Sequence, residues 1–215
     1  MKTTLIDMNN YPRKAHFDYF RSLAYPYVGV TAEVEITDFR RITKEKGCNF
    51  FHSFLWCAAG AANQIPEMRQ RQRGENIVQY DHCHTSHTVA REDGTYVYCD
   101  LDPSMPYTEF LRDAGEKQRH AVQCGDIDRE AGEEEGLFFI STMTWLTHTA
   151  LIQPVPMPAD SNPRITWGKF FERDGKILMP VSLLCNHALM DGRHIALFYE
   201  LLNKKLAEVA EKLKG

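Results

Sequence analysis

The 215-residue sequence lacks the features of several large classes of protein. No apolar run approaches the ~20 residues that cross a bilayer, and the N-terminus has no apolar stretch of signal-peptide length. An excess of positive charge is also missing, because the net charge is -4 and the lysines and arginines are scattered. We therefore expect neither a nucleic acid nor a membrane among its partners.

Cysteine pairs of the C-x-x-C type are absent as well. The six cysteines occupy positions 48, 57, 83, 99, 124 and 185. We expect free thiols in a reducing cytoplasm, because a chain of this length does not need disulfides to fold. An exported protein with disulfides is the alternative that an even number of cysteines leaves open.

The common nucleotide and hydrolase motifs are missing too. The sequence contains no G-x-S-x-G, no G-x-x-x-x-G-K-[ST] and no G-x-G-x-x-G. These absences argue against a serine hydrolase, a P-loop enzyme and a Rossmann oxidoreductase. Any catalytic chemistry must therefore depend on other residues.

The composition is that of an ordinary globular protein, with 43% hydrophobic and 25% charged residues. Apolar alternation and short apolar runs predict strands at 27–36, 76–80, 84–89, 95–99, 137–141, 165–171 and 176–185. Apolar residues at helical spacing predict helices at 37–47, 50–64, 108–120 and from 195 onward. Asp174-Gly175 is a strong signal for a hairpin turn between the last two strands. Strands and helices therefore mix along the chain, without a linker or a repeat.

A group of histidines and a cysteine lies at positions 82 to 87. Imidazole and thiolate are good zinc ligands, so His82, Cys83, His84 and His87 suggest a metal site. Residues 82 and 84 share one face of an extended strand, however, while Cys83 points away. We therefore predict no bound metal, and a bend that brings the group together is the alternative.

The segment before the last helix contains a candidate general base. A buried strand runs straight into Asn186 and His187, and Asp191-Gly192 follows four residues later. A histidine at the end of a strand is well placed to take a proton at the edge of a sheet. On spacing alone, a core histidine beside a turn is an equally good interpretation.

This segment, His187 to Gly192, resembles the H-x-x-x-D-G motif of chloramphenicol acetyltransferases and of dihydrolipoyl acyltransferase catalytic domains. Other segments resemble the chloramphenicol acetyltransferases in particular. They are Arg13–Phe17 (R-x-x-H-F), Pro66–Arg69, Ile140–Trp145 (I-S-x-x-P-W) and Ile165–Phe170 (I-T-x-x-K-Y). Because these segments follow the family's order from residue 11 to the C-terminus, the resemblance covers essentially the whole chain.

The resemblance implies both a fold and an activity. The expected fold is a single domain over residues 1–215, a two-layer α/β sandwich with a large mixed β-sheet and helices on one face. The expected activity is transfer of acetyl from acetyl-CoA, a co-substrate rather than a permanently bound cofactor, to a hydroxyl of chloramphenicol or a similar small molecule. Such an enzyme confers antibiotic resistance, and the family forms homotrimers with active sites between subunits.

The resemblance also implies roles for individual residues. His187 would be the general base in a direct transfer without an acyl-enzyme, and Asp191 would form an ion pair with Arg13 that holds the base's loop. Ser141 would bind the oxyanion of the tetrahedral intermediate, a charge that favours a fixed donor. Thr166 would hold a water molecule near it.

On the coenzyme side, the resemblance implies contacts from Lys169, Phe170 and Trp145. Phe170 keeps an aromatic face for the adenine but lacks the hydroxyl of the family's tyrosine.

The sequence also departs from the family pattern. Asn186 replaces a second histidine before the base, Thr144 replaces a proline, and Phe20 stands where the family often has a tyrosine near the acceptor. The acceptor wall differs at 148–154, and Tyr96-Val97-Tyr98 is bulkier than the family's pocket wall in that region. These changes leave open a catalytically silent, ligand-binding or drug-sequestering relative. A lipoyl-domain acyltransferase is disfavoured because no lipoyl module or linker is present.

Overall fold

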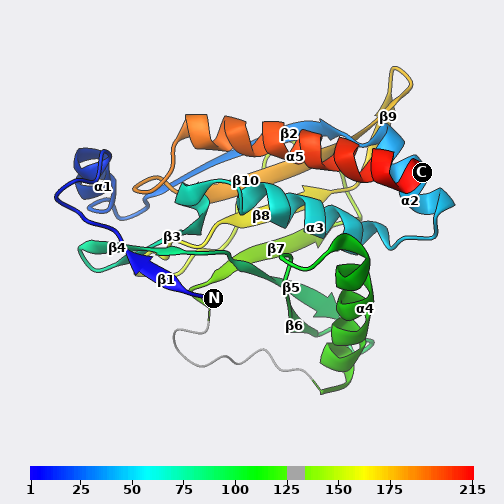
Figure 1. Ribbon diagram of the computed structural model, residues 1–215, viewed down its shortest axis with the longest axis horizontal. Helices are drawn as coiled ribbons and strands as arrows, with labels where there is room; N and C mark the ends of the chain where they lie inside the picture. Colours follow the sequence, from blue (N-terminus) through cyan, green and yellow to red (C-terminus); the bar gives the residue numbers. More distant parts are fainter. Residues whose placement is uncertain (125–133) are drawn as a thin grey trace.

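The computed structural model describes residues 1–124 and 134–215, and its central feature is a mixed β-sheet (Figure 1). The strand order is β2-β10-β8-β7-β5-β6, and β9 pairs with β10 beside β8. Strand β7 runs parallel to β5 and β8, and the other neighbours are antiparallel. The strands are β2 (Tyr27–Glu35), β5 (His84–Ala90), β6 (Tyr96–Leu101), β7 (Leu137–Met143), β8 (Arg164–Gly168), β9 (Phe171–Arg173) and β10 (Lys176–Asn186).

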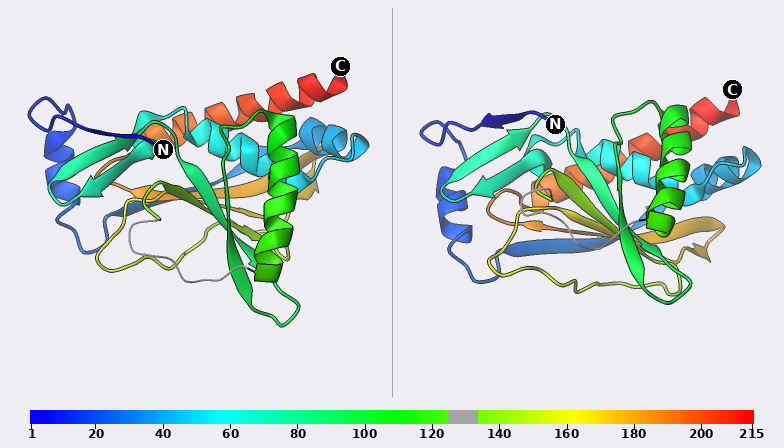
Figure 2. Two further views of the ribbon diagram at one scale, coloured as in Figure 1. Left: turned by 60° about the horizontal axis from the view of Figure 1, so that its bottom comes forward. Right: turned by 90° about the horizontal axis from the view of Figure 1, so that it is seen from below.

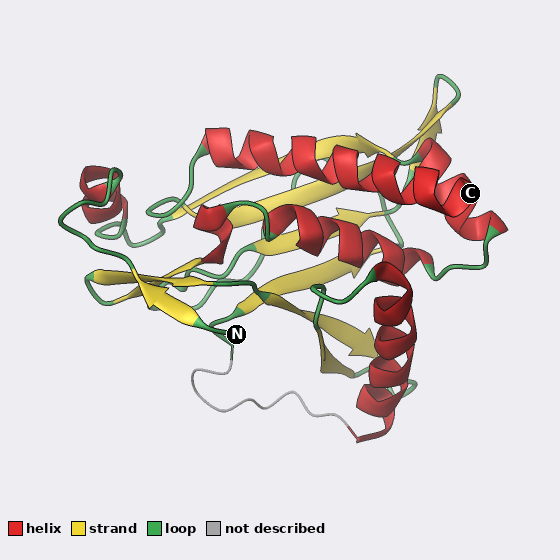
Figure 3. Cartoon of the chain, in the orientation of Figure 1, coloured by secondary structure: helices red, strands yellow, loops and turns green. Residues whose placement is uncertain are grey.

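Helices cover one face of this sheet, as the two-layer prediction requires (Figures 2 and 3). They are α2 (Thr37–Glu45), α3 (Phe50–Ala62), α5 (Gly192–Lys214) and, beside β6, α4 (Tyr107–Cys124). The short α1 (Lys14–Phe20) lies apart from this layer, near the start of α5. Within the described residues, no helix has both the length and the apolar character needed to cross a membrane.

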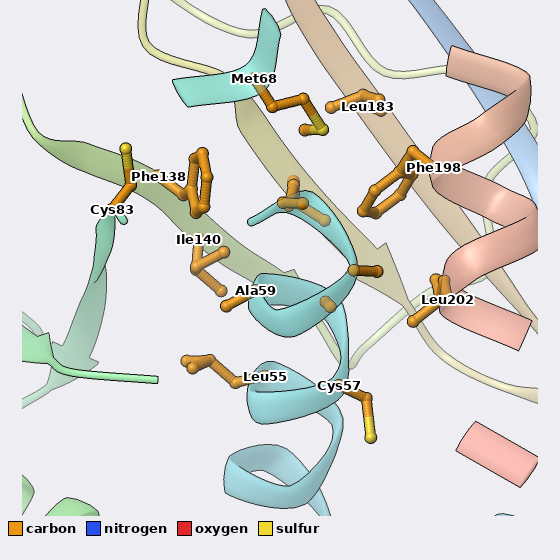
Figure 4. Close-up of a cluster of buried hydrophobic side chains, with 14 of the residues drawn as sticks. Leu55, Cys57, Ala59, Met68, Cys83, Phe138, Ile140, Leu183, Phe198 and Leu202 are labelled. Atoms are coloured by element: carbon orange, nitrogen blue, oxygen red, sulfur yellow. The ribbon is translucent and has the colours of Figure 1, made fainter. Parts of the chain in front are cut away.

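The centre of the core lies between the sheet, α3 and α5, and side chains of α2 and α4 extend it. Helix α3 is apolar on nearly all sides, which is typical of a helix with no exposed face. It packs between Phe138 and Ile140 of β7 on one side and Phe198 and Leu202 of α5 on the other (Figure 4). Burying a side chain of this size contributes about 1.5–3 kcal/mol. The apolar stripe predicted from residue 195 onward is the face of α5 that packs here.

A second, three-stranded sheet was not predicted. It consists of β1 (Thr3–Leu5), β4 (Asn76–Tyr80) and β3 (Gln70–Arg73), in the order β1-β4-β3, and β3 follows the short 3-10 helix η1 (Pro66–Arg69). Only β4 was recognised from the sequence. Strands β1 and β3 are too short to show alternation, and β3 is entirely polar, so pairing rather than local preference makes them strands.

The hairpin turn before β10 and the strand expected at 165–171 can now be compared with the structure. The hairpin at Asp174-Gly175 is confirmed, because both residues have a positive φ (52° and 74°), as the tight turn between two strands requires. The strand expected at 165–171 is instead two strands, β8 and β9, separated by Lys169 and Phe170. All six cysteines lie in the described part of the chain and are unpaired.

Candidate active site

The turn after β10 places His187 at the edge of the main sheet. Asn186, the last residue of β10, builds this turn: its backbone carbonyl accepts from the N–H groups of Leu189 and Met190, both at 3.1 Å. Its side-chain Oδ1 accepts from the N–H of Ala188 at 2.9 Å. The H-x-x-x-D-G segment is therefore a short, internally bonded connection between a buried strand and α5.

The imidazole of His187 is held in one orientation. Its Nδ1 lies 2.9 Å from the carbonyl oxygen of Met190, and a carbonyl only accepts, so Nδ1 carries the hydrogen. In the neutral ring, the lone pair is then on Nε2, which is the nitrogen able to take a proton. The ring stacks on Phe20 of α1, with centroids 3.8 Å apart and planes inclined by 9°. Sequence reasoning had placed Phe20 near the acceptor and missed this contact with the base.

Asp191 supports the turn without touching the base. Its Oδ2 lies 2.6 Å from a guanidinium nitrogen of Arg13, so the ion pair implied by the resemblance is present. Its Oδ1 accepts from the N–H of Arg193 and lies 2.9 Å from Nδ1 of His194. Asp191 is thereby the N-cap residue of α5. Partial burial alone would raise the pKa of Asp191, but the hydrogen bond and charge of Arg13 outweigh it and lower the pKa to about 2. The carboxylate is therefore ionised at neutral pH.

Asn186 also connects the turn to Asp160, in the long segment between β7 and β8. Its Nδ2 donates to the carbonyl of Asp160 at 2.9 Å. The Asp160 carboxylate accepts two hydrogen bonds from Arg164 (2.9 and 2.8 Å) and one from the hydroxyl of Tyr27 (2.9 Å). Burial, with the nearby carboxylate, raises the pKa of Tyr27, so its hydroxyl stays protonated. The sequence contained no signal for this network, because its members come from three separate segments.

Ser141 and Thr166 lie side by side on the face of the sheet opposite the helices. They are directly paired across β7 and β8, and Thr166 is paired in turn with Ser182 of β10. The Thr166 hydroxyl donates to Oε1 of Gln153 at 3.2 Å, and Nε2 of His148 lies 3.1 Å from the Ser182 hydroxyl. The segment 144–163 therefore covers this face (Figure 2).

A cavity of about 480 Å³ opens beside Ser141. Its walls come from β5, β6, β7, the start of β8 and the covering segment. Its lining includes the hydroxyl-bearing side chains of Ser86, Thr88, Tyr98 and Ser141, together with Phe139 and Gln153. A cavity of this size suits a small molecule, and its wall combines apolar groups and hydroxyls with the charged residues Glu134, Asp160 and Arg164. Of the departures from the family pattern, Tyr98, Gln153 and Pro154 line this cavity, whereas Tyr96, Val97 and residues 148–152 do not.

Within one chain, His187 and Ser141 are too far apart to act on the same substrate. Ser182 is level with Thr166 and Ser141 across the strands, and His187 follows five positions later (182 to 187). At about 3.3 Å per residue, the separation along the strand direction is about 17 Å. The residues expected to form one site therefore form two groups, at His187 and at Ser141.

The residues expected to contact coenzyme A form a third group, which lies at the C-terminal end of β8. The N–H of Lys169 donates to the carbonyl of Leu146 at 2.9 Å, which brings the interruption between β8 and β9 next to the turn after β7. Trp145 in that turn is 81% exposed, and the Arg40 guanidinium lies 4.3 Å from the centroid of the Phe170 ring. An exposed indole, an aromatic face and two cations are suited to a nucleotide with phosphates.

The group of four at positions 82 to 87 does not converge. The Sγ of Cys83 is buried 3.5 Å from a guanidinium nitrogen of Arg71, and His87 is buried with its ring centroid 4.9 Å from that of Phe51. His82 and His84 lie together, with ring centroids 5.3 Å apart, as the strand periodicity indicated.

A family model described as chloramphenicol acetyltransferase matches residues 1–203. A protein of Clostridium perfringens named chloramphenicol acetyltransferase is 28% identical over 207 residues, which are 93% of this chain and 92% of that protein. A solved structure of the same name, 27% identical, covers 95% of this chain and 100% of its own, with a TM-score of 0.83. A dihydrolipoamide acetyltransferase structure from Listeria monocytogenes, 16% identical, shares the fold alone, with a TM-score of 0.67.

Proposed function

Because this chain belongs to the chloramphenicol acetyltransferase family, we propose that it transfers acetyl from acetyl-CoA to a hydroxyl of chloramphenicol or a similar hydroxylated small molecule. The observation that carries this proposal is the imidazole of His187, whose Nδ1 is bonded to a carbonyl while Nε2 remains basic. The six cysteines of the chain are unpaired, which suits a reducing compartment. We therefore propose that the reaction takes place in the cytoplasm.

The proposed reaction is a direct transfer. Nε2 of His187 takes the proton of the acceptor hydroxyl as the hydroxyl oxygen forms a bond to the thioester carbonyl carbon. The carbonyl oxygen becomes an oxyanion, to which the Ser141 hydroxyl donates a hydrogen bond. When the tetrahedral intermediate collapses, the carbon–sulfur bond breaks and the leaving thiolate takes the proton from the imidazolium. No covalent acyl-enzyme is needed.

The surroundings of His187 suit both protonation states. The bond from Nδ1 to the Met190 carbonyl survives protonation, because Nδ1 is a donor in both forms. The ring of Phe20 stacks on the imidazole and fixes its plane. Arg13 and Asp191 contribute by holding the turn, which makes them positioning residues in this proposal.

We further propose a homotrimer in which His187 of one subunit faces Ser141 of the next. The separation of about 17 Å along the strand direction places the two groups apart within one chain, so a site that contains both needs a second copy. Strand β2 supports the assembly, because it is a nine-residue edge strand with the apolar Val30 45% exposed. Ile152 of the covering segment is 94% exposed. A ring closed by one repeated contact would bury such surfaces.

A mixture of two inactive variants tests the shared site. Rings assembled from equal amounts of His187→Ala and Ser141→Ala subunits should recover about a quarter of the wild-type activity. About three quarters of randomly assembled rings contain both variants, and each of these has one interface in three where an intact His187 meets an intact Ser141. Activity would be measured after the variants are unfolded and refolded together.

The control is the same mixture without refolding, in which subunits stay in their original rings and activity stays at the variant level. Light scattering should show a particle near three times 24.8 kDa in every sample. Absence of recovery in rings shown to contain both variants would contradict the shared site.

Chloramphenicol itself should be acetylated, though more slowly than by relatives with the usual pocket wall. The reason is that the departures at Tyr98 and Gln153 line the cavity while the residues for the chemistry are retained. Release of free thiol from acetyl-CoA would be followed with chloramphenicol and with a panel of other hydroxylated antibiotics. No thiol release with any hydroxylated acceptor would favour the silent, drug-sequestering alternative instead.

A further inference from the structure

Three side chains far from Ser141 and His187 meet at one corner of the main sheet. His84 is the first residue of β5, His82 precedes it by two positions, and Asp102 directly follows the end of β6. Because Thr85 is paired with Leu101, His84 stands opposite Asp102 across the antiparallel pair. The metal-binding atoms of the three residues all lie within 4.8 Å of one another, the one such group of three among the described residues.

The spacing fits a small cation. Zn²⁺ lies about 2.0–2.1 Å from imidazole nitrogen and carboxylate oxygen, so two ligand atoms of a tetrahedral site are about 3.3 Å apart. Nε2 of His84 and Oδ2 of Asp102 are already 3.5 Å apart. The His82 ring is tilted by 39° to that of His84, with centroids 5.3 Å apart, and one ligand atom from each of the three residues lies within 4.8 Å of the others. Small rotations about side-chain bonds would therefore bring the ligand nitrogen of His82 to the same distance.

The surrounding bonds orient two of these ligands. Oδ1 of Asp102 accepts from the N–H of Ser104 (2.9 Å) and from its hydroxyl (2.6 Å), which leaves Oδ2 for a further partner. Nδ1 of His82 lies 3.1 Å from Oδ1 of Asp81, which leaves Nε2 of that ring for a further partner. A carboxylate behind a histidine is the usual outer support of a metal-binding imidazole.

The site is accessible from solvent. The three side chains are between 25% and 31% exposed, so a cation can enter and keep a water molecule as its fourth ligand. We propose that His82, His84 and Asp102 bind a divalent transition-metal ion, with Zn²⁺ as the best match to two imidazoles and one carboxylate. The metal would join the first residues of β5 to the end of β6, so it would stabilise the fold and take no part in acetyl transfer.

Titration of the purified protein with zinc chloride alone tests this proposal. We expect one Zn²⁺ per chain by calorimetry, with a micromolar dissociation constant and a rise in melting temperature. Asp102→Asn and His84→Gln should abolish this binding, because each removes one of three ligands. Asp81→Asn should weaken it by about 10–100-fold, as expected for a residue that only orients a ligand.

Two controls separate this site from other zinc-binding groups. His120→Ala removes an exposed histidine of α4 and should bind as the wild type does. Substitution of Co²⁺ should produce d–d absorption without the thiolate-to-cobalt band that a cysteine ligand would add. If wild-type protein binds no Zn²⁺ below millimolar concentration, or if the ligand variants bind as tightly as the wild type, the proposal is wrong.

Discussion

Replacement of His187 by alanine is expected to abolish acetyl transfer while the protein folds and assembles normally. The substitution removes Nε2, the basic nitrogen left when Nδ1 bonds to Met190. General-base catalysis typically contributes about 10²–10⁴ in rate, and we expect a loss of at least that size in kcat. The turn itself should persist, because Asn186 and Asp191 make its bonds through their own side chains and backbone.

The measurement is the rate of thiol release at saturating acetyl-CoA, with His120→Ala as the matched control for loss of a histidine at a surface distant from the turn. Circular dichroism and light scattering would show that fold and assembly are retained. Added imidazole that restores part of the rate would identify the missing group as the base. Turnover by His187→Ala at the wild-type rate would refute the assignment.

Ser141→Ala is expected to have the second-largest effect. If the hydroxyl donates to the developing oxyanion, its removal should lower kcat by about 10²–10³. The KM for acetyl-CoA should change little, because the bond is made chiefly in the transition state. The substitution removes one oxygen atom from a half-buried position that lines the cavity, so the strand pairing of β7 should be unaffected.

Thr142→Ala is the matched control, because it removes a hydroxyl from the next position of β7, whose side chain points to the other face of the sheet. It should keep the wild-type kcat. Steady-state kinetics with both substrates varied would distinguish the two roles of Ser141. A raised KM with unchanged kcat would mean that Ser141 binds the substrate in the ground state and has no special role in the transition state.

The local elements were largely predictable because their signals are local. The apolar stripe of α5 and the apolar character of α3 are typical of buried helices, and Asp174-Gly175 marked the hairpin. The strand that ends just before His187 could be recognised because an apolar run stops there and Asp191 follows as a helix cap. Strands β1 and β3 escaped prediction because three or four residues carry no periodic signal, and their pairing with β4 determines their conformation.

The sequence by itself determined the types of element and the family motifs that made His187, Ser141 and Asp191 candidates. No local pattern shows which of these residues are neighbours: the resemblance implied the pair of Arg13 and Asp191, and the tertiary structure produces it. Arg13 reaches Asp191 across 178 positions, and Ser141 meets Thr166 only through the register of two parallel strands. The period of a strand predicts where a side chain points, but register and strand order determine what lies beside it. For the same reason the chain separates His187 from Ser141, and Asp102 joins His84, although no local pattern of residues connects them.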